Sequence, residues 1–229
     1  MSGFWLKIIA IVTMLIDHGT AILVPYDSPF WIVGRGIGRL AFPIFCFLLV
    51  EGFLHTSNVK KYLLRLGIFA FISEIPFDLA FNHSYLDLSS QNVFFTLFIG
   101  LLVLILLRKI DDKYKGKGSY TVLYMVLYAI IIIGGCILAL VLGTDYYYAG
   151  VLMILCFYLL RSNKVLLTVA LIIIYEFALG GIQILAVFAI IPILFYNGQR
   201  GRKMNKYLFY AFYPAHIFIL YLISMYLIK

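Results

Sequence analysis

The sequence predicts an all-α membrane protein: a polytopic helix bundle of about nine transmembrane helices, forming one domain over residues 1–229. Hydrophobic residues make up 64% of the chain and charged residues only 12%, and the mean hydropathy is +1.04. Soluble domains are far more polar, and the apolar stretches here recur at lengths that suit a bilayer crossing. No linker or fixed-period repeat divides the chain, so a single domain is the simplest interpretation.

Nine apolar runs follow one another, and polar or basic segments separate them. The first run has one lysine, Lys7, near its start and lacks a small-residue cleavage pattern, so we interpret it as a retained span rather than a signal peptide. Several later runs are shorter than the roughly 20 residues of a full crossing, which predicts tilted neighbours, local thinning or helices that stop in a cavity. The predicted helices are residues 5–24, 37–54, 62–81, 91–107, 119–142, 147–160, 165–179, 182–196 and 206–227.

Basic residues predict the orientation of these helices. If the N-terminus is cytoplasmic, fifteen of the 18 lysines and arginines fall on the inner side, which is the asymmetry expected of inner loops. Nine spans then place the C-terminus outside. The net charge of +8 is therefore mostly topology, and without a basic motif interleaved with aromatics we expect no nucleic-acid partner. Outside this inner group lie Arg35, Arg39 and Lys229.

Two patterns predict no chemistry. The three cysteines, Cys46, Cys136 and Cys156, lie far apart in apolar runs without the spacing of metal ligands, so we expect small buried hydrophobic side chains and no metal site. The segment "GIGRLAFP" superficially resembles a phosphate loop, but no strand precedes it and it lies on the outer side. We interpret it as a flexible helix entry.

Polar side chains within the apolar runs gather toward the outer side. An ionised side chain at mid-membrane costs about 2.5–3.5 kcal/mol on insertion scales, so such groups need partners in a polar cavity. We therefore expect one wet pocket in the outer half of the bundle. Its candidate residues are Asp17, His18, Arg39, Glu74 and Asp78, joined from loops and helix ends by Gln91, Asn92, Asp145, Glu176 and Gln183. Glu51, near the inner end of its helix, is the exception.

An ion pair is predicted between Arg39 and one of two carboxylates. Glu74 and Asp78 are four residues apart and share a helical face, and Pro76 between them frees a backbone carbonyl. The guanidinium of Arg39 can pair with a carboxylate through two hydrogen bonds, so we expect a partner in Glu74 or Asp78. The alternative is that such a pair only holds helices together.

His18 is the candidate general base. Neighbours on a helix point about 100° apart, so we expect Asp17 and His18 to find different partners across the bundle. An imidazole titrates near neutral pH, which suits proton transfer, although a buried histidine can also be a packing residue. His216 is a candidate to line the same cavity. His55 and His83, at helix ends or in loops, are weaker candidates.

Several blocks of sequence carry a resemblance to a known family. They are "LKIIAIVTMLIDHG", "GRLAFPIFCFLLVEGF", "KKYLLRLGIFAFISEIPFDLAF", "NVFFTLFIGLL" and, more loosely, "FYPAHIFIL". They resemble the TraX family of integral membrane proteins, which includes the enzyme that acetylates the N-terminus of F-type pilin. The resemblance implies an acetyltransferase of a bacterial cytoplasmic membrane that uses acetyl-CoA. The positions that match are Asp17, His18, Arg39, Pro43, Glu51, Glu74, Pro76, Asp78 and Asn92.

The implied donor suggests a place for its phosphates. Cations at inner helix ends would bind them, although for any single residue plain topology is the simpler explanation. The candidate cofactor-binding residues are Lys60, Lys61, Arg65, Arg108, Arg161 and Arg202, with Lys109, Lys164 and Arg200 in the wider set.

The implied reaction suggests roles for the outer residues. The acceptor, an amine such as a peptide N-terminus, would enter from outside and contact Asn92, Gln91, Asp145, Glu176 and His216. A carboxylate among Asp17, Glu74 and Asp78 would fix the tautomer of His18, and Arg39 or Asn92 would donate to the oxyanion. Direct transfer and an acetyl-histidine intermediate both remain open.

Two other functions remain open at this stage. A small proton-coupled transporter needs the same buried carboxylates, histidine and proline-interrupted helices, although no two-fold repeat is visible. An O-acetyltransferase that acts on a glycan or lipid hydroxyl needs the same donor. An acidic outer cavity would favour a cationic amine over a hydroxyl.

Overall fold

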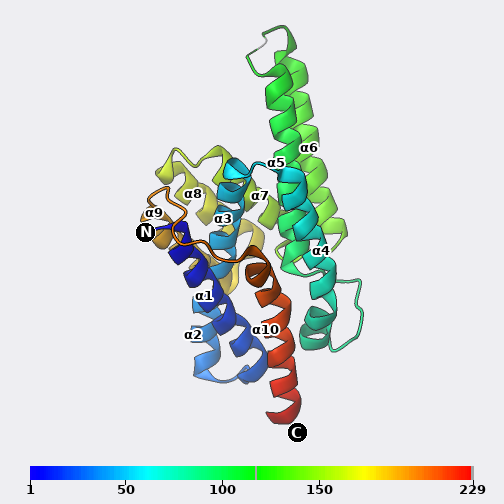
Figure 1. Cartoon of the computed structure of the whole chain (residues 1–229), viewed down its shortest axis with the longest axis vertical. Coiled ribbons are helices and arrows are strands. Elements are labelled where there is room, and N and C mark those ends of the chain that lie inside the picture. The colour runs from blue at the N-terminus through cyan, green and yellow to red at the C-terminus, as the bar shows by residue number, and fades with distance from the viewer. Residues whose placement is uncertain (117, 228–229) are drawn as a thin grey trace.

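The protein is a bundle of helices in a computed structural model that describes residues 1–116 and 118–227, and no strand occurs in these ranges. Figure 1 shows the helices running roughly along the long axis, with the hairpin of α5 and α6 reaching furthest at one end. The α-helices are α1 (Gly3–Leu23), α2 (Pro29–Gly38), α3 (Ala41–His55), α4 (Val59–Phe77), α5 (Val93–Tyr114), α6 (Thr121–Val141), α7 (Tyr147–Leu159), α8 (Lys164–Ile174), α9 (Ile190–Leu194) and α10 (Lys206–Leu227). Short π- or 3-10-helical segments are Asp78–Asn82, Gly118–Tyr120, Tyr175–Leu179 and Gly181–Ala189.

All nine predicted runs are helical, and five helical stretches within the described ranges are long and apolar enough to cross a membrane. These five are α1, the α2–α3 stretch Pro29–His55, α5, α6 and α10. The lipid explains their exposed apolar faces: only 11% of the most apolar window in α6 is buried inside the protein. The shorter apolar helices, such as α7, pack beside them.

The second helix begins earlier than the sequence predicted. The expected start was residue 37, but α2 begins at Pro29, and the Ser28 side chain accepts a hydrogen bond from the Phe30 amide at 3.3 Å. Serine at the N-cap and proline at the first helical position are a strong start signal. This earlier start places Arg35 inside a helix.

The glycines of "GRGIGR" form a packing face and are not the flexible entry that we expected. Gly34 and Gly38 lie in regular helix, where an added Cβ would collide with the side chains of Thr20 and Asp17. Their missing side chains allow α2 to approach α1 closely. The same approach brings the polar residues of α2 to Asp17.

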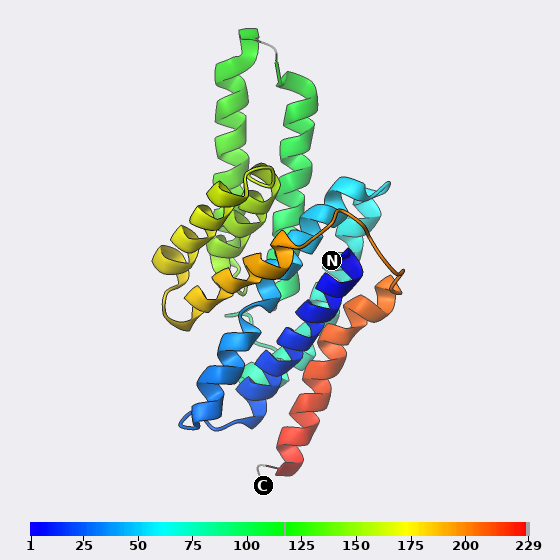
Figure 2. The same cartoon turned by 90° about the vertical axis from the view of Figure 1, so that its left-hand side faces the viewer.

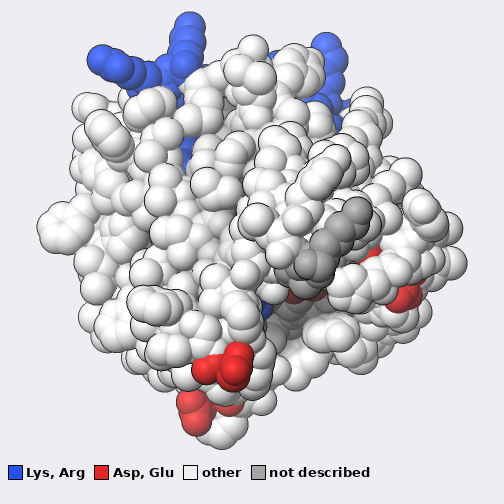
Figure 3. Space-filling view, turned by 90° about the horizontal axis from the view of Figure 1, so that it is seen from below, with Lys and Arg blue, Asp and Glu red and all other residues white. Residues whose placement is uncertain are grey.

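A central group of helices encloses the polar residues. α1 packs against α2, α3 and α10, while α4 packs against α5 and α10. Figure 2 shows α1 and α10 side by side from a second direction. Figure 3 looks onto the end opposite the α5–α6 tip, where acidic side chains lie around a hollow in a largely uncharged face. The predicted orientation makes this the outer end.

Candidate functional site

Two neighbouring cavities lie between these helices. The larger, about 490 Å³, we call the inner cavity; it lies between the first turns of α1, α4 and α10 and the last turns of α3. The smaller, about 240 Å³, we call the outer pocket; it lies between the last turns of α1, α2 and the loop before α7. The two cavities share four wall residues, Met14, Phe45, Val93 and Tyr213. They are therefore separated by little more than one layer of side chains.

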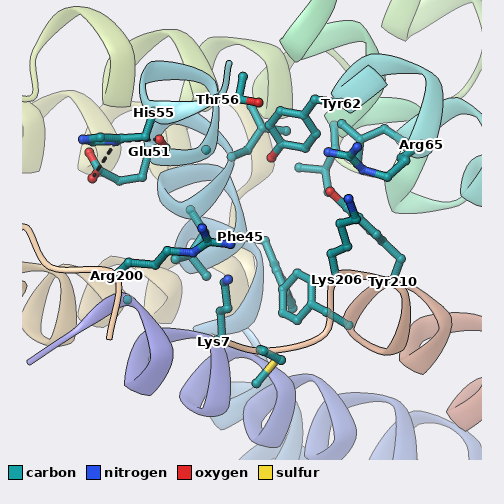
Figure 4. A pocket seen from close by; sticks show the side chains of 18 of the residues that line it. Lys7, Phe45, Glu51, His55, Thr56, Tyr62, Arg65, Arg200, Lys206 and Tyr210 are labelled. Carbon is teal, nitrogen blue, oxygen red and sulfur yellow. Dashed lines mark hydrogen bonds and ion pairs between the residues drawn. The ribbon is translucent and has the colours of Figure 1, made fainter. Parts of the chain in front are cut away.

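The inner cavity collects cations from four separate segments. Lys7 comes from α1, Arg65 from α4, Arg200 from the segment after α9, and Lys206 from the start of α10. Figure 4 shows Lys7 and Arg200 pointing toward each other beside Phe45. It also shows Arg65 and Lys206 converging near Tyr210. None of the four cations forms an ion pair within the described parts of the chain.

One acidic residue lies at the edge of the inner cavity. The Tyr196 hydroxyl donates to the Glu51 carboxylate at 3.0 Å, and His55 Nδ1 lies 3.8 Å from the same carboxylate. Glu51 is thus the inner exception that the sequence indicated. With four cations against one carboxylate, the lining charge stays positive.

Of the six predicted cofactor-binding residues, the structure brings only Arg65 to the inner cavity. The others, Lys60, Lys61, Arg108, Arg161 and Arg202, do not line it. Arg108, for example, packs over the Phe53 ring with its guanidinium carbon 3.8 Å from the ring centroid. Arg200, from the wider set, does line the cavity. Lys7 and Lys206, which the sequence placed only as inner-side charges, line it as well, because α1 and α10 begin beside each other.

The outer pocket is built around Asp17. Its carboxylate pairs with Arg35 at 2.9 Å and with Arg39, while Arg35 also donates to the Asp17 carbonyl at 3.4 Å. The predicted partners of Arg39, Glu74 and Asp78, are therefore wrong. The reason is the early start of α2, which places two arginines four residues apart on the face that meets α1.

His18 turns away from Asp17, as the helical angle predicted. Its Nδ1 lies 2.7 Å from Nε2 of His216, and Nδ1 of His216 lies 2.7 Å from the Phe212 carbonyl oxygen. His18 lines the outer pocket, whereas His216 is 5% exposed and stands behind it. His216 was expected to line the same cavity; it contacts His18 from behind the pocket wall and does not line the pocket itself.

Glu74 and Asp78 do not line the outer pocket. Asn92 donates to the Glu74 carboxylate and to the Ala70 carbonyl, and its own side-chain oxygen caps the Phe94 amide at 3.0 Å. Asn92 is thus fully engaged as the N-cap of α5. The expected single cluster of all five ionisable residues is therefore divided into two.

Asp78 organises the outer loop. Its carboxylate accepts hydrogen bonds from the Asn82 side chain at 2.9 Å and the Asp87 amide at 2.8 Å. The loop ends at Gln91, whose backbone bonds to Gly143 and to the Asp145 amide. Asp78 therefore holds the loop in place, and Glu74 holds the start of α5 through Asn92.

Of the remaining predicted contacts, only Asp145 reaches the outer pocket. Its carbonyl accepts from Thr96, and its exposed side chain lines the pocket beside Tyr146. Gln91 contributes its backbone, and Glu176 is exposed in the π-helical turn Tyr175–Leu179, away from both cavities. Because two arginines and two aspartates line the pocket, with both arginines paired to Asp17, it is balanced in charge and not acidic as expected.

The comparisons with known proteins agree with the resemblance seen in the sequence. The profile of the TraX family, described as TraX protein, matches residues 2–224. The chain belongs to the TraX family. A relative, described as probable fimbrial assembly protein FimC, serogroup H1, of Dichelobacter nodosus, is 32% identical over 99% of this chain and 97% of its own length. No solved structure matches. The TraX match includes every residue that lines the two cavities.

Proposed function

We propose that this TraX-family chain is a membrane-embedded acetyltransferase that moves an acetyl group from acetyl-CoA to an amine. The observation that carries the proposal is the pairing of the two cavities: a cationic inner cavity adjoins a histidine-containing outer pocket across four shared side chains. A donor with an anionic head and a long neutral arm fits this arrangement. The head would stay inside and the arm would reach outward.

The inner cavity would hold the phosphorylated nucleotide of the donor. Cations without ion-pair partners bind phosphates well, because no existing pair has to be broken. Lys7, Arg65, Arg200 and Lys206 meet this requirement among the described residues. The thioester arm would then pass Met14 and Tyr213 to reach the outer pocket.

The reaction in the outer pocket would be a direct acyl transfer. The amine nitrogen attacks the thioester carbonyl carbon, His18 accepts a proton from that nitrogen, the C–S bond breaks, and the leaving thiolate takes the proton to give free CoA. Arg35, which the sequence did not single out, and Arg39 would stabilise the oxyanion, while Asp17 fixes both guanidinium groups. An acetyl-histidine intermediate remains the alternative route.

The acceptor would be a peptide amine presented from the outer side. Family membership supports this choice, because the D. nodosus relative is described as a fimbrial assembly protein and the TraX family includes an enzyme that acetylates the N-terminus of F-type pilin. Pocket charge no longer argues for a cationic amine, because the arginines balance the aspartates. A glycan or lipid hydroxyl is therefore the second acceptor to compare.

The test is release of free thiol from acetyl-CoA by the purified protein, with a pilin-like peptide as acceptor and mass spectrometry of the product. His18→Ala should lower the rate by about 10²–10⁴-fold, which is the usual contribution of a positioned general base. The matched control is His83→Ala, because His83 is an exposed loop histidine outside both cavities.

The outcomes separate the candidate functions. Thiol release with an acetylated peptide N-terminus supports the proposal, and acetylation of an offered sugar hydroxyl instead would identify an O-acetyltransferase. No thiol release from a folded protein that takes up solute into vesicles would overturn the proposal in favour of a transporter. Equal rates for wild type and His18→Ala would remove His18 from the mechanism.

A further inference from the structure

Three groups form a continuous hydrogen-bonded row behind the outer pocket. The row runs from the Phe212 carbonyl to His216 and on to His18, with 2.7 Å at each of its two steps. His216 is buried in α10, whereas His18 stands at the pocket wall. The row therefore connects backbone deep in the bundle to the side chain that faces the cavity.

The backbone carbonyl at one end determines where the protons lie. A carbonyl oxygen only accepts, so Nδ1 of His216 carries the hydrogen in this bond. In a neutral imidazole the other nitrogen is then an acceptor, so Nε2 of His216 accepts from Nδ1–H of His18. The same rule leaves a lone pair on Nε2 of His18, which has no protein partner within the described ranges.

The ring geometry suits a direct hydrogen bond between the two histidines, and the Phe212 carbonyl sets its direction. The planes of His18 and His216 differ by 7° and their centroids lie 5.0 Å apart. Together with the 2.7 Å distance between the two nitrogens, this separation places the rings edge to edge in nearly one plane. The N–H of His18 therefore points along the lone pair of His216 Nε2. Phe81 and Tyr213 contact the His18 ring edge-to-face and hold it in this orientation.

We infer that His216 is a positioning residue that holds His18 in the tautomer with a free Nε2, the form that acts as a general base in the outer pocket. The inference rests on the proposed function. In the forward reaction Nε2 of His18 takes the proton from the attacking amine and then donates it to the leaving CoA thiolate. His216 keeps its own protons throughout and stabilises the transient imidazolium through its acceptor nitrogen.

This arrangement differs from the carboxylate support that the sequence predicted. Asp17, the nearest carboxylate in sequence, is engaged with Arg35 and Arg39. Glu74 and Asp78 bond to the α5 start and to the outer loop. A second histidine, set by a backbone carbonyl, takes the place of the carboxylate.

The experiment compares two substitutions at His216 in the full-length purified protein. His216→Leu removes the acceptor, and thiol release from acetyl-CoA should fall about 10²-fold in kcat with KM for acetyl-CoA unchanged. His216→Gln keeps a side-chain carbonyl that accepts from His18 Nδ1, so it should retain most of the activity. The control for packing is Ile217→Ala, which changes the adjacent, fully buried residue of α10 without touching the row.

A second measurement does not depend on catalysis. NMR of isotope-labelled histidine nitrogens, with His18 assigned from the His18→Ala spectrum, should report a protonated Nδ1 and a bare Nε2 in the wild type, and a mixture of tautomers in His216→Leu. Full activity in His216→Leu, or the opposite tautomer in the wild type, would overturn the inference. A drop in Ile217→Ala as large as that in His216→Leu would also overturn it, because packing would then explain the loss.

The two proposals fail in different ways. A wild-type protein that releases no thiol refutes the proposed function, although the tautomer remains measurable by NMR. An active wild type whose His216→Leu and His216→Gln variants behave alike refutes only the role of His216.

Discussion

The inner cavity and the outer pocket handle charge in opposite ways. In the inner cavity four cations from different segments lack ion-pair partners among the described residues. In the outer pocket Arg35 and Arg39 are already paired with Asp17, and His18 is already bonded to His216. Free charges suit reversible binding of a charged ligand, whereas paired charges suit a rigid reaction site. The two cavities should therefore respond differently to substitution.

The largest effect is expected for Asp17→Asn. Removing one partner of a buried ion pair leaves the buried Arg39 uncompensated, which destabilises by about 3–5 kcal/mol. Thermal unfolding in detergent should show a clear drop in Tm together with loss of thiol release. Asp112→Asn, at an exposed position near the inner end of α5, is the matched control.

A double substitution sharpens this prediction. Asp17→Asn with Arg39→Met removes the most buried pair of charges and leaves only the more exposed Arg35 without its partner. It should recover part of the lost Tm without recovering activity, because replacing both partners of a buried pair costs less than removing one. An unchanged Tm in Asp17→Asn alone would show that the outer pocket does not depend on its ion pairs.

An intermediate effect is expected in the inner cavity. Lys7→Gln and Arg65→Gln should each raise KM for acetyl-CoA by about tenfold or more, because a hydrogen bond to a charged group contributes about 1.5–3 kcal/mol. Because these cations have no ion-pair partners, their removal leaves no buried carboxylate unpaired, and Tm and kcat should stay near the wild-type values. S-acetyl-pantetheine, which lacks the nucleotide, should react at the same rate with the wild type and with both variants.

Arg161→Gln provides the control, because Arg161 is an inner-side residue that lines neither cavity. If it raised KM as much as Lys7→Gln, general surface charge would account for donor binding and the inner cavity would lose its assigned role.

The smallest effect is expected for Glu74→Gln. The glutamine oxygen still accepts a hydrogen bond from Asn92, so the start of α5 should be retained. The free energy of unfolding should then change by less than about 1 kcal/mol. Thiol release should stay within about twofold of wild type, because Glu74 does not line the outer pocket. A loss as large as that of His18→Ala would instead place Glu74 in the reaction.

The sequence predicted the helices and the separation of Asp17 from His18 because hydropathy and helical angle are local properties. It did not predict the partner of Arg39, because the choice among Asp17, Glu74 and Asp78 depends on where α2 begins and how closely the glycine face packs on α1. The position of Lys7 and Lys206 in the inner cavity was missed for a similar reason. Only the packing of α1 beside α10 shows that these two inner cations share a cavity.

Four side chains common to both cavities also have to block the passage of ions from one side to the other. They are Met14, Phe45, Val93 and Tyr213. Three of them are apolar and the fourth is a tyrosine buried to 4% exposure, so they form a poor route for ions between the two sides. The narrow, uncharged thioester arm of acetyl-CoA can pass between such side chains. Its nucleotide is too large and too highly charged to pass, so it stays in the inner cavity. In the proposed reaction the cell would export acyl groups one at a time, without opening a leak and without losing the carrier.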